Sequence, residues 1–279
     1  MIHCTRPCRE GYVKISEIVI RGVALQMIGI VEIICYKAIL NLRSEARKKR
    51  LSYVWWVLEP LLYLAVFYLA FSKIFHRGES SYFLYLISGI VPWLWLSKSV
   101  TSSANSICSQ NRVLQSFKLQ AVIFPAISIL QALLKQIPAF GLLFALFVLH
   151  GIYPNIYWFG LIPVMLVQLC FIAVISLTLS MLIPFYKDFS VIVANIIHLG
   201  MFISGVVHRI DLTQSPWHFY YQLNPMVTIL NGYRDILIAY RWPAWSTLAW
   251  ITIGSLVCIF LLLKLMNRFN NVYPRIILE

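Results

Sequence analysis

The stretch RKKRLSYVWWVLEPLLYLAVFYLAFSKIF, residues 47–75, decides the fold class of this chain. Four cations and a Trp pair precede an apolar run that is long enough to cross ~30 Å of hydrocarbon as a helix. Basic residues and tryptophans are typical anchors at a membrane interface. The stretch therefore predicts a transmembrane helix, with Glu59 and Pro60 close to its start.

The composition of the whole chain is that of an integral membrane protein. Of its 279 residues, 60% are hydrophobic and only 12% are charged, and the mean hydropathy is +0.78. Soluble domains are nearer half apolar and a quarter charged. In a soluble protein, a net charge of +13 would suggest binding to nucleic acid. Here the cations cluster beside apolar runs, so they indicate which side of the membrane each loop lies on.

Apolar segments separated by short polar breaks predict six spanning helices in an all-α fold. We expect a single membrane domain over residues 1–279, with a six-helix bundle at 53–266 and a cytoplasmic tail at 267–279. Ten Lys or Arg precede residue 51, and this bias predicts that both termini are cytoplasmic. The predicted spans are residues 53–75, 82–106, 121–149, 159–184, 190–208 and 245–266.

Residues 14–42 are predicted to form an amphipathic helix at the cytoplasmic surface. Charged residues from Glu10 to Arg21 recur at steps of three and four, which places them on one helix face. A seventh span over the apolar part of this segment is the alternative. It would move the N-terminus to the outside.

Two helix stripes are candidates for the lining of a channel. In the first span, steps of three and four place an acid and aromatic rings on one face, and an acid in a span is costly toward lipid. This face is therefore predicted to point inward, although Glu59 could instead simply pair with the basic cluster. A similar stripe in the fifth span suggests a water-filled path or, alternatively, a packed interface. The candidate residues are Trp56, Glu59, Tyr63, Phe67, Asn195, His198 and Phe202.

The last break, from about residue 209 to 244, is too apolar for a plain loop. Its segment MVTILNGYRDILIAY predicts a short amphipathic helix, and Asn224-Pro225 predicts the turn that starts it. We expect short re-entrant helices here on the outer side, where they can line a cavity.

No nucleotide-binding or catalytic motif stands out in the sequence. The P-loop pattern G-x-x-x-x-G-K-[ST] is absent, so the chain is not expected to bind ATP in that way. His208, Asp211 and His218 are the nearest approach to a catalytic cluster, and solvated loop residues are the alternative interpretation. We therefore expect no catalytic residue, no metal and no cofactor in this chain.

Four motifs in order resemble the permease subunits of ABC polysaccharide exporters, which move capsule, O-antigen and teichoic acid chains. LSYVWWVLEPLLYLAVFYLAFSKIF is similar to the family's first span, and YFLYLISGIVPWLWLSKSVTSSANSI to its second. FYKDF stands where the family has an aromatic-Arg-Asp turn, and LNPMVTILNGYRDIL is similar to its outer gate segment. The resemblance covers about residues 40–266.

The resemblance implies a homodimer in the bacterial inner membrane that binds two copies of a separate ATPase subunit, which carries ATP and Mg²⁺. Its substrate would be a lipid-linked polysaccharide, as in O-antigen or capsule export. Spans one and five would line the channel, and the loop at 109–120 would dock on the ATPase. The implied docking residues are Arg112, Phe117 and Lys118, and the implied outer gate residues are Trp217, Asn224, Pro225 and Arg234.

Two other functions remain alternatives at this point. A membrane-embedded enzyme of lipid-linked sugar metabolism would need acids or histidines at the cytoplasmic face, where the loops offer only Asp188. A secondary transporter would normally bury more ionisable residues at mid-membrane and show clearer internal repeats.

Overall fold

The computed structural model describes residues 29–47, 52–70, 80–110, 120–186, 188–207, 223–270 and 272–273. Helices make up most of this part of the chain, and no strand occurs within it. The predicted all-α membrane fold is confirmed.

The helices of the described part follow one another in this order along the chain. A first helix covers residues 29–47. The labelled elements are α2 (Ser52–Tyr68), α3 (Ser80–Ala104), α4 (Ser106–Ser109), α6 (Ile123–Leu149), the 3₁₀ helix η2 (Ile156–Gly160), α7 (Leu161–Leu182), α8 (Phe189–Ile203), α10 (Pro225–Leu237) and α11 (Trp245–Phe269).

Four helices of the described part are long and apolar enough to cross a membrane. They are Tyr82–Ala104, Ile123–Leu149, Ile156–Leu182 and Trp245–Phe269. The helices at the first and fifth predicted spans are shorter apolar helices, Val54–Tyr68 and Phe189–Ile203. At 1.5 Å per residue, such helices fall short of ~30 Å. The count of six full spans is therefore not established, while the order of apolar helices is as predicted.

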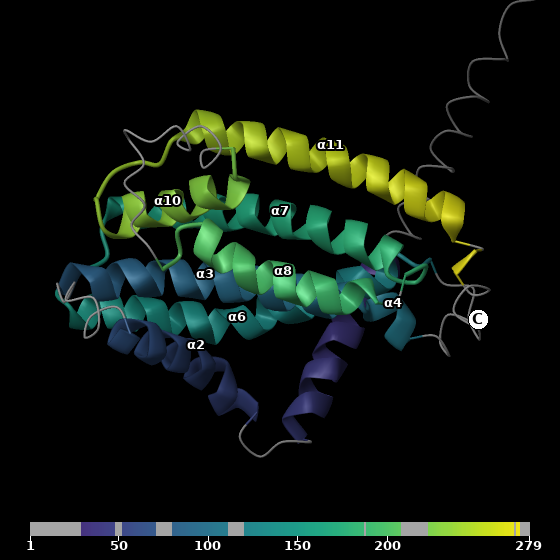
Figure 1. Ribbon diagram of the computed structural model, residues 1–279, viewed down its shortest axis with the longest axis horizontal. Coiled ribbons are helices and arrows are strands. Elements are labelled where there is room, and N and C mark those ends of the chain that lie inside the picture. Colours follow the sequence, from purple (N-terminus) through teal and green to yellow (C-terminus); the bar gives the residue numbers. More distant parts are fainter. Residues whose placement is uncertain are drawn as a thin grey trace, which may run out of the picture.

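Helix α3 lies at the centre of the bundle. It packs against α2, α6, α7, α8 and α10, whereas α11 packs mainly on α7. Figure 1 shows α3, α6, α7 and α8 running side by side, with α2 and α11 on opposite flanks. Residues of α3 therefore meet side chains from most other elements.

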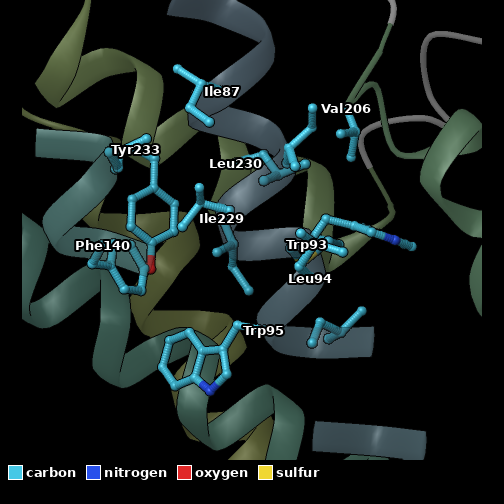
Figure 2. Packing of buried hydrophobic residues seen from close by; sticks show 14 of the residues in the cluster. Ile87, Trp93, Leu94, Trp95, Phe140, Val206, Ile229, Leu230 and Tyr233 are labelled. Carbon is cyan, nitrogen blue, oxygen red and sulfur yellow. The ribbon is translucent and has the colours of Figure 1, made fainter. Parts of the chain in front are cut away.

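The core is apolar and rich in rings. Phe140 of α6 stacks on Tyr233 of α10 with ring centroids 6.0 Å apart, and Trp95 of α3 meets Phe140 edge-on at 6.0 Å. Figure 2 shows these rings together with Ile229 and Leu230, which face α3. Such packing joins α3, α6 and α10 into one cluster.

A proline in the middle of α3 is supported by two glutamines from neighbouring helices. Pro92 has no N–H and disturbs the helical hydrogen bonds around it. Gln136 of α6 donates to the Val91 carbonyl at 2.8 Å, and Gln168 of α7 donates to the Pro92 carbonyl at 2.8 Å. The Tyr233 hydroxyl donates to the Gln168 side chain at 2.7 Å, so this buried polar network is well connected.

The helix over residues 29–47 contacts α6 at its start. Ala38, which is fully buried, clusters with Ile123 and Ile127. Figure 1 shows this helix, in purple, running across the direction of α3 and α6 rather than along it. Residues 14–28 of the predicted surface helix lie outside the described residues.

The short helix predicted in the last break is present as α10. The Asn224 side chain caps it by accepting from the Met226 N–H at 3.0 Å, and Pro225 occupies its first turn. Its apolar face is buried against α3 and α7. Residues 208–222, where a second short helix was expected, lie outside the described residues.

Candidate functional site

A polar cavity of about 540 Å³ opens where α2, α3, α6 and α8 meet. Three of the predicted channel residues on α2 line it, and the fifth predicted span contributes His198. The lining residues are Glu45, Trp56, Glu59, Tyr63, Leu94, Ser97, Lys98, Thr101, Ser102, Ser128, Gln131, Ala132, Lys135, Gln136 and His198. The predicted stripe on α2 therefore lies along one wall of this cavity, and its role in lining a channel stays a prediction.

Two ion pairs cross this cavity between different elements. The Lys98 ammonium of α3 lies 2.7 Å from the Glu59 carboxylate of α2. The Lys135 ammonium of α6 lies 2.5 Å from the Glu45 carboxylate, which also accepts from Gln131 at 2.7 Å. Both pairs are partly exposed to the cavity. Glu59 therefore has an ion-pair partner on α3, which was not among the partners foreseen in the basic cluster.

Aromatic side chains continue the α2 stripe toward α8. The rings of Tyr63 and Phe67 stack at 6.2 Å, and Phe67 meets Phe202 of α8 edge-on at 6.1 Å. The two predicted stripes therefore touch. Asn195 is exposed and does not line the cavity.

His198 hydrogen-bonds to the backbone of its own helix. Its Nδ1 lies 2.7 Å from the Ala194 carbonyl, and a carbonyl can only accept, so Nδ1 carries the hydrogen and donates. This bond orients the ring on the turn of α8 that faces the cavity.

Sequence reasoning missed Lys98, Lys135 and Glu45 as site residues. The available signal was that ionisable residues inside apolar spans are costly and mark functional positions. Lys98 and Lys135 are such residues, because each lies within a predicted span. Their common cavity could not be read from spacing, because they lie on different helices.

A second cluster surrounds the turn that follows α8. The Arg234 guanidinium of α10 donates to the Gly205 carbonyl at 2.9 Å and lies 3.6 Å from the centroid of the Tyr85 ring. The Tyr85 hydroxyl donates to the same carbonyl at 2.9 Å. Gly205 has a φ of +68°, a conformation that favours glycine.

The predicted gate residues Asn224 and Arg234 meet at this turn. Asn224 donates to the Ser204 hydroxyl at 3.0 Å while it caps α10. Gly89 of α3 leaves the space for Arg234, since an added Cβ would lie 2.8 Å from a guanidinium nitrogen. Pro225 serves as the first residue of α10. Trp217 lies outside the described residues.

The predicted ATPase dock falls on residues 111–119, outside the described part, with Arg112, Phe117 and Lys118. Its far end is fixed, because the Ala121 N–H donates to the Asn270 side chain at 2.7 Å. An apolar cluster beside it joins Phe124 to Tyr273, and burial raises the pKa of the Tyr273 phenol to about 12. The loop base is thus attached to the C-terminal end of α11.

Comparison with known proteins agrees with the resemblance noted from the motifs. Residues 36–238 match the family model of the ABC-2 type transporter. An O-antigen export system permease protein RfbA of Myxococcus xanthus is 25% identical over 205 residues, which are 73% of this chain and 79% of that protein. A protein of the same name from Klebsiella pneumoniae is 22% identical over 199 residues, 71% of this chain and 77% of that protein. Since the family match spans most of the membrane helices, this chain belongs to the ABC-2 type transporter membrane family.

Proposed function

We propose that this chain is the membrane-spanning subunit of an ATP-driven exporter that moves a lipid-linked polysaccharide, such as O-antigen or capsule, across the bacterial inner membrane. Family membership supports a transporter subunit that pairs with an ABC ATPase. The two relatives named as O-antigen export permeases support a glycan as the cargo.

The observation that carries the proposal is the cavity at α2. Trp56 and Tyr63 offer ring faces, which are rigid apolar surfaces suited to sugar rings. Charged, amide and hydroxyl groups surround them and can hydrogen-bond to sugar hydroxyls. A path with these two kinds of surface suits a hydrated polymer.

The working unit in this proposal is two copies of the chain with two ATPase subunits. Both termini lie in the cytoplasm, as the excess of Lys and Arg before residue 51 indicates. The ATPase subunits bind ATP and Mg²⁺, and this chain supplies the path. The purified chain alone should show no ATP hydrolysis.

A cell that lacks this chain tests the proposal. In the deletion strain, surface polysaccharide should disappear and lipid-linked glycan should accumulate on the cytoplasmic leaflet. In a separate experiment, a tagged copy of the chain should co-purify with an ATPase. Restoring the chain with Trp56→Ala and Tyr63→Ala together should leave export about tenfold below wild type, because two stacking contacts are lost.

The matched control is Trp55→Ala, on the neighbouring residue that is 53% exposed and does not line the cavity. It should export normally. Unchanged surface polysaccharide in the deletion strain, or ATP hydrolysis by the chain free of any partner, would refute the proposed function.

A further inference from the structure

The charges that line the α2 cavity cancel one another. Among the residues that the structure describes, its lining holds two carboxylates, Glu45 and Glu59, and two ammonium groups, Lys98 and Lys135. The other described lining side chains are amides, hydroxyls and apolar groups, together with the imidazole of His198. The cavity therefore carries close to zero net charge, although the chain as a whole carries +13.

The cancellation is local as well as overall. Each lysine contacts one of the two acids, at 2.7 Å for Lys98 and Glu59 and at 2.5 Å for Lys135 and Glu45. The two members of each pair come from different elements, so packing of the helices holds the charges in place. A ligand in the cavity thus meets paired dipoles rather than an isolated cation.

We propose that this cavity selects uncharged, hydroxyl-rich segments of a glycan, and that Glu45 and Glu59 set this preference by cancelling Lys98 and Lys135. The inference rests on the proposed function, because it concerns what the path admits. It makes the two acids specificity-determining residues, in addition to any part they have in holding the helices together.

The physical reason is that sugar hydroxyls both donate and accept hydrogen bonds. Carboxylates accept and ammonium groups donate, so a row of ion pairs offers partners of both kinds to a neutral sugar. An anionic sugar gains no net attraction from a balanced cavity and must face two carboxylates. When one acid is neutralised, an uncompensated ammonium remains and attracts the anion strongly in a partly dehydrated site.

Saturation-transfer NMR on the full chain in phosphatidylcholine nanodiscs tests this selection with two probes, neutral maltohexaose and anionic hexagalacturonate. Wild type should bind maltohexaose and bind hexagalacturonate at least about tenfold more weakly. Glu59→Gln should raise the affinity for hexagalacturonate about tenfold at low salt, and 1 M NaCl should remove the gain. Its affinity for maltohexaose should hardly change.

A second variant separates charge from structural damage. Glu59→Gln with Lys98→Gln loses the same ion pair but restores a balanced cavity, so it should return to wild-type selectivity. Asp235→Asn is the matched control, because that acid pairs with Arg241 away from the cavity. It should change neither affinity.

Three results would overturn the inference: wild type binds both probes equally, wild type does not bind maltohexaose, or Glu59→Gln and the charge-neutral double variant behave alike. None of these binding results bears on the phenotype of the deletion strain. Loss of surface polysaccharide in the deletion strain would still support export, so the two proposals fail separately.

Discussion

Arg234 shows how a cation is used deep inside this membrane protein. Only 8% of its surface is exposed, and its guanidinium lies between the Tyr85 ring and the carbonyls of Gly205 and Val206. The ring face and the carbonyl dipoles both favour a positive charge. The charge therefore fixes the turn after α8 against α3 and α10.

Arg234→Met should lower the stability of the purified chain by about 2 kcal/mol, because charge-assisted hydrogen bonds are lost and buried carbonyls stay unpaired. Thermal unfolding in detergent should show a Tm lower by roughly 5 °C. Arg241→Met is the control, since the ion pair of Arg241 with Asp235 is largely exposed and should contribute little. Equal Tm values for Arg234→Met and wild type would contradict this assignment.

The residues at the cavity were partly predictable. Trp56, Glu59 and Tyr63 follow from helical spacing and from the cost of an acid toward lipid, and the structure places all three on the cavity wall. The partner of Glu59 did not follow. Spacing defines a face within one helix, but it does not say which residue of another helix meets that face. Only the structure identifies Lys98 as the ion-pair partner of Glu59.

Helix α2 has two distinct faces. Trp56, Glu59 and Tyr63 line the cavity, whereas Val54 and Leu58 are exposed on the opposite face of the helix. In the membrane the exposed apolar side chains suit lipid or another apolar surface, while the cavity wall suits water.

Single cysteines placed in a cysteine-free chain should report these faces. Trp56→Cys and Tyr63→Cys should react with a water-soluble maleimide in membranes, because the thiolate forms and reacts in water. Val54→Cys and Leu58→Cys should react at least about tenfold more slowly, since apolar surroundings keep the thiol protonated and dry. Labelling at equal rates on both faces would rule out a water-filled cavity here.

The lengths of the helices were less predictable than their order. The prediction of 53–75 for the first span followed hydropathy. The regular helix covers Ser52–Tyr68 and two π-helical residues follow it, while residues 71–75 lie outside the described residues. Hydropathy records which residues tolerate lipid and contains little information on backbone hydrogen bonding. For α10 the helix start was predicted well, because Asn224-Pro225 is a local capping signal.

The two ends of the bundle carry different kinds of contact. The Arg234 cluster lies where α8 ends and α10 begins, while the Ala121–Asn270 bond joins the start of α6 to the end of α11. The loop of residues 111–119 starts and ends at this second end, close to α4. A partner that binds the loop therefore contacts the bundle at the end away from Arg234.

Charge reversal in this loop should weaken assembly with the ATPase. Arg112→Glu with Lys118→Glu should cut recovery of the partner in a pull-down by about tenfold, because two attractive contacts become repulsive. Arg241→Glu is the control, since Arg241 follows α10 at the other end. Full recovery of the partner with the reversed loop would show that docking occurs elsewhere.

Pro92 gives the central helix a mechanical property. A helix usually bends easily at a proline, because one helical hydrogen bond is missing there. In α3, however, the Gln136 side chain donates to the Val91 carbonyl and the Gln168 side chain donates to the Pro92 carbonyl. We therefore expect these two bonds to stiffen α3 near Pro92, so that the half of the helix with Gly89 and the half with Lys98 move together. A displacement at one end of α3 would then reach the other end as a rigid tilt of the helix instead of being taken up as a bend at Pro92.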